Sequence, residues 1–392
     1  MIDVLVISHA CFTSINRNVY HLLVKDGYRL EMVVPESLRF PSGVREAQPA
    51  MPEDPPIHFL NLIGDNPRTY SFEGLDELLK EKKPSIVLLD NDPVSRLAIF
   101  AGEWCHKNEA LLFCISCENL PLGILPSIRR RGLKSLPAIM LKRWMLSKTK
   151  NTVDGIFTIN RDGQKIFQEE GYRWVRYMPL GFDPAYFFPD ADNRLRIRNE
   201  LGLKNTIIAY FGRLTTEKGI HILIRALAGL KNLPWELMMD AFDEFGSDYS
   251  QQVKKELEEA DIMDRVVYIS PSHFEIAAYM NAADLVVVPS VSVPNWKEQY
   301  GRVAAEAMAC GKTVIASDSG SLPELLNSHG ILFPEGNVEV LREILKKKIP
   351  AALNEEPNSR LIADYATKEL SICKQKLVLK NGFETLKKQK TG

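Results

Sequence analysis

Short runs of apolar, often β-branched residues alternate along the chain with longer segments whose apolar positions recur at helical spacing. The short runs predict buried strands at residues 4–7, 30–34, 86–89, 111–115, 154–159, 205–210, 235–239, 266–269, 285–288, 314–316 and 330–333. The longer segments predict helices at 17–25, 75–82, 94–107, 161–170, 219–227 and 301–311. Regular strand–helix alternation indicates parallel sheets with right-handed crossovers, so we expect an α/β protein.

Prolines and a glycine interrupt this alternation between Met178 and Pro189. A change of pattern at such a segment is typical of a domain boundary. We therefore expect an N-terminal domain at 1–180 and a second domain at 181–365, followed by a basic, helical tail at 366–392. Residues 35–56 are rich in proline and polar residues and predict an irregular connection.

Two carboxylates eight positions apart flank the start of the helix predicted at 301–311. Glu298 follows the strand at 285–288, and the carboxyl ends of parallel strands are where open α/β sheets bind ligands. Glu306 lies one to two turns along the helix, on a face that can point to the same crevice. The N–H groups of a first helical turn have no partner within the helix, which offers an anion seat near Tyr300, Gly301 and Arg302.

Each acid also has an ordinary structural interpretation. A glutamate near a helix start usually favours the helix dipole and does nothing more. That interpretation is weaker for Glu306, because its neighbours Val303 to Ala309 are otherwise small or apolar. A buried carboxylate needs partners, and a pair of sugar hydroxyls is one suitable partner. From the residues alone, both interpretations stay open.

The stretch from Glu298 to Val314 reads E-x7-E followed by A-M-A-C-G-x-x-V. It resembles the donor-site signature of the family 4 retaining glycosyltransferases, which have the GT-B fold. The resemblance implies two Rossmann-like parallel-sheet domains facing each other across a cleft. Residues 1–180 would bind the acceptor and 181–365 the nucleotide-sugar. The last helix, within 366–392, would cross back to the first domain.

A second motif follows the strand at 205–210. Gly212 permits a tight turn there, and Arg213 and Lys218 supply two cations beside a helix start. A diphosphate is bound well by backbone N–H groups, a bidentate arginine and a point-charge lysine. Such a loop alone is usually just solvated, but its place upstream of the E-x7-E stretch favours donor binding.

The resemblance assigns further roles. Glu298 would accept hydrogen bonds from the transferred sugar and Glu306 from the ribose hydroxyls. The nucleotide base would lie against the loop that carries Ser270, His273 and Phe274. Glu118 and Asn119, after the strand at 111–115, match a branch of the family that has a polar pair near the transferred sugar, downstream of an acidic-Pro motif like Asp92-Pro93. That Glu118 and Asn119 only cap a turn is an equal alternative.

These matches imply a hexosyltransferase-type glycosyltransferase that uses a UDP-sugar or GDP-sugar in polysaccharide biosynthesis. The acceptor would be a glycan, a glycolipid or a lipid-linked sugar. Retention would proceed by front-face attack, with Glu298 positioning the sugar and Arg213 and Lys218 stabilising the leaving diphosphate; a nucleophilic Glu298 is an alternative. We expect no metal requirement. Alternative functions are a GT-B nucleotide-sugar epimerase, a phosphorylase, or a catalytically silent GT-B subunit that scaffolds a glycan-assembly complex.

The bulk composition excludes several classes of protein. The 392 residues are 45% hydrophobic and 25% charged, with 49 basic against 50 acidic side chains, so no overall charge attracts nucleic acid. Six cysteines make no disulfide framework, and Cys114 and Cys117 form a lone CxxC, which is a poor zinc site. The N-terminus lacks a signal-peptide pattern, and no apolar run reaches membrane-span length. We expect a cytoplasmic protein, either soluble or peripheral on the inner face of the membrane.

The segment 120–150 contains eight Lys and Arg residues and no Asp or Glu, interleaved with Trp, Leu and Ile. The ordinary interpretation is a solvated basic face. The same mixture describes a surface that lies against an anionic membrane, and we favour that interpretation slightly.

Overall fold

The computed structural model describes residues 2–40, 43–240, 246–352 and 359–391. They form two compact units, Met1–Gly181 with Ile372–Gly392 (unit 1) and Phe182–Ser371 (unit 2). The chain therefore leaves unit 1 at 181 and returns to it at 372, so unit 2 extends to 371 rather than to 365.

Unit 1 is built on a seven-stranded parallel sheet. Its strands, in spatial order, are β11 (Val175–Tyr177), β10 (Gly155–Thr158), β9 (Leu111–Ser116), β8 (Ile86–Asp90), β1 (Val4–Ser8), β2 (Leu30–Pro35) and β5 (Ile57–Leu60). Its helices are α1 (Asn18–Lys25), α2 (Leu75–Lys82), α3 (Arg96–Lys107), α4 (Ile124–Arg131), α5 (Leu136–Thr149), α6 (Arg161–Glu169) and α15 (Ile372–Thr391). The central strand β1 is buried along its whole length, which is why it reads as a continuous apolar run.

Unit 1 also has two short antiparallel strand pairs outside the main sheet. They are β3 (Ser37–Phe40) with β4 (Gly43–Glu46), and β6 (Leu62–Ile63) with β7 (Ser71–Phe72). The expectation of an irregular connection at 35–56 is therefore wrong for β3 and β4. These strands are partly or fully exposed on both faces, so they lack the apolar alternation that marks a half-buried strand.

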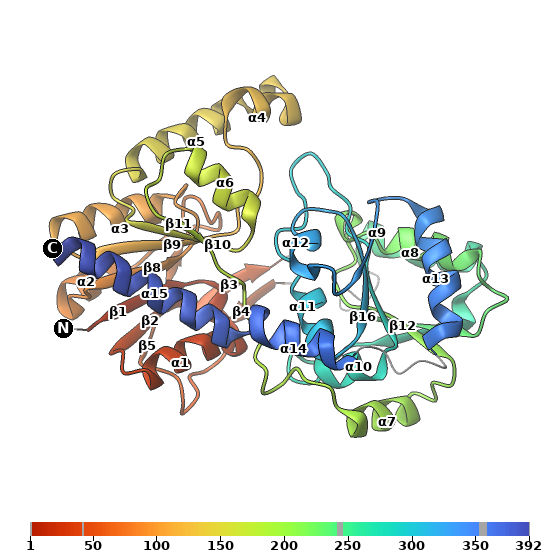
Figure 1. The fold of residues 1–392 in the computed structure, drawn as a ribbon. Coiled ribbons are helices and arrows are strands. Elements are labelled where there is room, and N and C mark those ends of the chain that lie inside the picture. The colour runs from red at the N-terminus through yellow and green to blue at the C-terminus, as the bar shows by residue number, and fades with distance from the viewer. Residues whose placement is uncertain (1, 41–42, 241–245, 353–358, 392) are drawn as a thin grey trace. The chain divides into compact units, whose positions relative to one another are not determined.

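The C-terminal helix α15 packs onto unit 1, beside α1 and β10 (Figure 1). Phe383 is fully buried and meets Phe113 of β9 edge to face, with ring centroids 5.1 Å apart. Lys376 and Lys380 both pair with Asp26 at the end of α1, at 3.1 and 3.0 Å. These contacts explain why the end of the chain belongs to the first unit.

Unit 2 has a six-stranded parallel sheet. The strands, in spatial order, are β14 (Val266–Ile269), β13 (Trp235–Asp240), β12 (Thr206–Tyr210), β15 (Leu285–Val288), β16 (Thr313–Ser317) and β17 (Ile331–Phe333). The helices are α7 (Ala191–Glu200), α8 (Ile220–Ala228), α9 (Asp248–Glu259), α10 (Ile276–Ala282), α11 (Arg302–Ala309), α12 (Leu322–Leu326), α13 (Val338–Ala352) and α14 (Ser359–Leu370).

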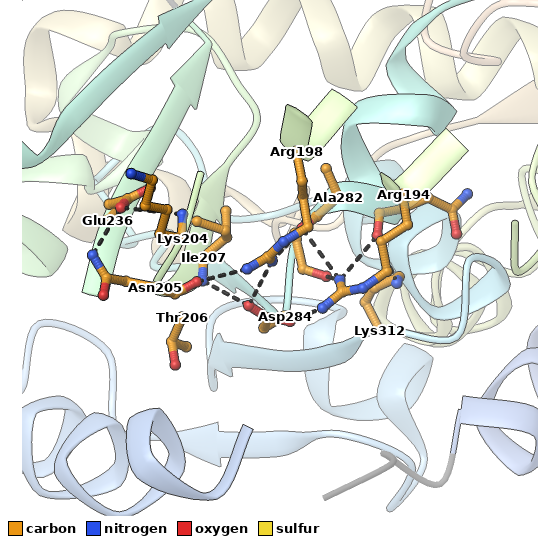
Figure 2. A network of polar contacts seen from close by, with 12 residues as sticks. Arg194, Arg198, Lys204, Asn205, Thr206, Ile207, Glu236, Ala282, Asp284 and Lys312 are labelled. Carbon is orange, nitrogen blue, oxygen red and sulfur yellow. Dashed lines mark hydrogen bonds and ion pairs between the residues drawn. The ribbon is translucent and has the colours of Figure 1, made fainter. Parts of the chain in front are cut away.

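An ionic network fixes α7 to the amino-terminal edge of this sheet (Figure 2). Asp284, just before β15, pairs with Arg194 and Arg198 of α7 and accepts from the backbone N–H of Ile207 in β12 at 2.7 Å. Lys312, just before β16, donates to the carbonyl of Asn281 at the end of α10 at 2.9 Å. This network lies at the amino-terminal ends of the strands, so the loops at their carboxyl ends take no part in it.

Candidate functional site

Both sheets have a topological switch point, where successive strands depart in opposite directions. In unit 2 the chain passes from β12 to β13 and β14 on one side, then returns to β15 on the other side of β12. In unit 1, β2 and β8 flank β1 in the same way. Crevices at the carboxyl ends of such strands are the usual ligand sites of open α/β sheets.

The switch point of unit 2 brings together two predicted donor residues. Lys218, at the end of the loop after β12, places Nζ 2.7 Å from Oε2 of Glu298, which lies in the loop after β15. Ser290 Oγ donates to the same carboxylate oxygen at 2.7 Å. The ring of Trp296 lies beneath the ammonium, with Nζ 4.9 Å from the ring centroid. Glu298 is only 5% exposed, so these partners stabilise a carboxylate that is largely removed from water.

Close backbone contacts hold the two loops in register. Val291 N–H donates to the carbonyl of Glu217 at 2.8 Å, which joins the Lys218 loop to the Glu298 loop. Gly219 has φ +70°, and a Cβ there would lie 1.9 Å from the carbonyl oxygen of Pro289. Only glycine fits this crossing, which explains a glycine directly after Lys218.

The second acid of the motif lies inside α11. Glu306 is 9% exposed, and burial raises the pKa of its carboxyl to about 7, although the charge of Arg302 opposes the shift. The helix begins at Arg302, after Gly301 with φ +86° and the buried Tyr300. A carboxyl whose pKa lies near 7 changes its charge easily. A ligand that donates hydrogen bonds to it favours the ionised form.

The remaining predicted donor residues lie at the surface of unit 2. Arg213 is exposed, and its backbone carbonyl accepts a hydrogen bond of 2.9 Å from the hydroxyl of the buried Tyr210. Gly212 precedes it and is half-buried. Ser270, His273 and Phe274 are exposed after β14.

Although His273 is exposed, partial burial lowers the pKa of its imidazole, and the positive charge of Arg302 lowers it further. Phe274 instead packs edge to face on Tyr186, with ring centroids 5.6 Å apart.

Glu118 and Asn119 belong to unit 1 and are buried after β9. Glu118 pairs with Arg68 at 3.2 Å and with Lys142 of α5 at 3.5 Å. Asp92, after β8, accepts a short hydrogen bond from Ser116, and burial together with the charge of Glu118 raises the pKa of the Asp92 carboxyl. Unit 1 therefore holds two neighbouring carboxylates, and the charges of Arg68 and Lys142, which pair with Glu118, also oppose the rise in the Asp92 pKa.

Comparison with known proteins identifies unit 2. Residues 192–369 match the family model for glycosyl transferases group 1. Most of unit 2 is thus similar to the glycosyl transferases group 1. A curated relative, the D-inositol 3-phosphate glycosyltransferase of Mycolicibacterium smegmatis, is 33% identical over 199 residues, which cover 47% of this chain and 42% of the relative. The chain thus aligns with about two fifths of that relative's length.

Two solved structures share the fold of the whole chain. Sucrose-phosphate synthase from Thermosynechococcus elongatus superposes with a TM-score of 0.72 at 18% identity, covering 98% of this chain and 99% of that one. Anabaena Alr3699/HepE in complex with UDP-glucose gives a TM-score of 0.71 at 18% identity, covering 99% and 100%. The two parallel-sheet units are those of the GT-B fold, as expected.

Several residues at the two sites were not predicted from the sequence. Ser290 and Trp296 contact the Glu298–Lys218 pair, and their nearness to Glu298 in the same loop is the one signal that could have indicated them. Arg68 has no such signal. Lys142 is part of the basic segment in sequence, yet its side chain turns inward to Glu118.

The segment 120–150 folds as α4, a short 3-10 turn and α5. Its exposed large apolar side chains are Ile124, Leu125, Leu133, Leu136, Met140, Leu141 and Trp144. Among the residues that the structure describes, no helix is both long and apolar enough to cross a bilayer.

Proposed function

We propose that the protein is a retaining, metal-independent hexosyltransferase that moves a sugar from a UDP-sugar or GDP-sugar to a glycan, glycolipid or lipid-linked acceptor. The observation that carries the proposal is the contact between Lys218 and Glu298 at the switch point of unit 2. It supports a single site in which a cation that binds the diphosphate and a carboxylate that binds the sugar form a direct ion pair. The group 1 domain and the UDP-glucose bound by Alr3699/HepE support a nucleotide-sugar donor.

In this proposal Lys218 and Arg213 bind the donor diphosphate and stabilise the charge that develops on it as the sugar leaves. Glu298 accepts hydrogen bonds from the transferred sugar, and Glu306 accepts them from the ribose diol. Tyr300, Gly301 and Arg302 lie at the phosphate end, and the loop with Ser270 and His273 lies at the base. Glu118 and Asn119 act near the transferred sugar.

We further propose that the exposed apolar face of α4 and α5 contacts an anionic membrane surface and that the protein is peripheral there. Trp144 and Met140 present about half of their surface to solvent on the same helix. Amphipathic surfaces with aromatic and basic residues lie in the bilayer interface.

A thermal-shift panel with UDP, GDP, ADP and dTDP, each with and without magnesium, tests the donor site. A nucleotide at a hundred times its Kd adds about 2.7 kcal/mol, enough to raise the Tm by several degrees. We expect a shift with one nucleotide that magnesium does not change and that Glu306→Ala removes. No shift with any of the four would contradict the proposal.

A further inference from the structure

Among the residues that the structure describes, Lys218 contacts two groups of different kinds. Its ammonium donates to Glu298 at 2.7 Å and lies 4.9 Å from the ring centroid of Trp296. An aromatic face attracts a cation without accepting its protons. The ammonium can therefore change its hydrogen-bonding partner while it stays over the indole.

The indole of Trp296 is carried by a turn that two backbone hydrogen bonds close. Val293 N–H donates to the carbonyl of Trp296 at 2.8 Å, and Trp296 N–H donates to the carbonyl of Val293 at 3.1 Å. Pro294 and Asn295 occupy the two central positions, which suits a β-turn because proline presets its φ and asparagine tolerates turn conformations. Both backbone polar groups of Trp296 are thus hydrogen-bonded within the turn.

Glu298 is the more deeply buried member of the pair. Its side chain is 7% exposed, against 24% for Lys218. Ser290 also donates to the oxygen that Lys218 contacts. If Lys218 leaves, the carboxylate keeps Ser290 but loses the cation that lies 2.7 Å away, and a further donor would offset that loss because a charge removed from water is costly to leave uncompensated.

We infer that Trp296 is a positioning residue for Lys218, and that Lys218 exchanges Glu298 for the donor diphosphate while it remains over the Trp296 ring. This inference rests on the proposed function. The sugar hydroxyls of an intact donor replace Lys218 on Glu298, so the exchange leaves both charges with partners. A nucleoside diphosphate without sugar pairs with Lys218 but has no sugar hydroxyl to donate a hydrogen bond to Glu298.

The exchange has a consequence for turnover. Once the sugar has left, the return of Lys218 to Glu298 competes with the diphosphate product for the ammonium. Glu298 would then favour product release as well as donor orientation. A variant with no charge at 298 should hold the free nucleoside diphosphate more tightly than the wild type does.

The experiment measures the Kd of UDP, or of GDP if the panel selects it, by titration calorimetry. The proteins are the wild type, Trp296→Phe, Trp296→Leu, Glu298→Gln, Lys218→Met and the double variant Lys218→Met/Glu298→Gln. We expect Trp296→Leu to weaken binding by about 2- to 30-fold, the range of a cation–π contact, and Trp296→Phe to recover part of the loss. Glu298→Gln should tighten binding.

Simple repulsion between Glu298 and the phosphates would also make Glu298→Gln bind more tightly, and the double variant separates the two causes. Repulsion predicts the same gain whether residue 218 is Lys or Met. Exchange predicts a larger gain with Lys218 present, because only then is an ion pair broken on binding.

Melting curves and circular dichroism establish that each variant is folded. If Trp296→Leu binds as tightly as the wild type, the positioning role is refuted. An equal or smaller gain for Glu298→Gln in the Lys218 background refutes the exchange. If the wild-type protein binds none of the four nucleotides, both the donor site and this inference are refuted. If the wild type binds a nucleotide and the variants bind it with the same Kd, only the inference is refuted.

Discussion

Glu306 makes the stability of the free protein depend on pH in a defined direction. Burial raises its carboxyl pKa from 4.5 to about 7 in the folded state. Because the folded pKa lies above the unfolded value, the stabilisation from the protonated form is fully present below pH 4.5. It falls as the pH rises from 4.5 to 7 and is lost above 7.

The shift sets the size of the effect. Each pKa unit corresponds to 1.36 kcal/mol, so the ionised Glu306 costs about 3 kcal/mol of folding free energy at pH 8 relative to pH 4. No large discount for solvent applies, since the residue is 9% exposed. For a unit of this size about 3 kcal/mol corresponds to a Tm change of about 6–12 °C.

The variant Glu306→Gln cannot ionise, so it should gain this amount relative to the wild type between pH 4.5 and 8. We propose measuring the Tm of both proteins without nucleotide at half-unit pH steps. The quantity to plot is the Tm of Glu306→Gln minus that of the wild type, in which all other titrating groups cancel. The difference should rise through the interval from 4.5 to 7 and then level off. A difference that stays constant with pH would refute the buried, neutral carboxyl.

Three further predictions concern other parts of the molecule. Arg17→Met should lower the free energy of unfolding by about 3–5 kcal/mol in urea titration, because the fully buried guanidinium pairs with a buried carboxylate and donates to three backbone carbonyls; a loss below about 1 kcal/mol would contradict this. Gly219→Ala should abolish nucleotide binding and lower the Tm, since its Cβ would overlap the carbonyl of Pro289; retained binding would show that the loops move apart freely. Replacing Met140 and Trp144 together by Ser should weaken sedimentation with phosphatidylserine vesicles without lowering the Tm, as both side chains are exposed; unchanged sedimentation would refute the proposed membrane face.

The strands and the switch-point loops could be predicted because burial leaves a strong imprint on sequence. Strands β1 and β12 are buried at every position and, apart from Ser8 at the end of β1 and Thr206 at the start of β12, read as apolar runs. Both parallel sheets followed from their alternation with helices. The exposed pair β3–β4 left no such imprint, since it has no face turned to the core.

The candidate site could be predicted only as a set of residue types, without its contacts. The spacing of Glu298 and Glu306 indicated one crevice, yet it gave no sign that Lys218 rests on Glu298. An ion pair between residues 80 positions apart depends on which strands are neighbours, and that order is a property of the sheet. Trp296 is close to Glu298 in sequence, but its contact with Lys218, 78 positions away, depends on the same strand order.

The directions of the side chains on α5 show why counting basic residues in the sequence overestimates the charge that is exposed. Apolar residues occur all round this helix: Ile139, Met145 and Leu146 are buried, whereas Met140 and Trp144 are exposed. A pattern without a single apolar face does not reveal which way its charges point.

The structure divides the eight basic residues of 120–150 into two groups. Lys142 and Arg143 pair with Glu118 and Glu170, and Arg130 and Arg131 are also partly buried, which leaves Arg129, Lys134, Lys148 and Lys150 exposed. At about 1 kcal/mol for each basic residue near an anionic bilayer, the available attraction is half of what the sequence suggests. A membrane contact through this face must therefore draw much of its free energy from the exposed apolar side chains, so added salt should weaken it less than the loss of Trp144 does.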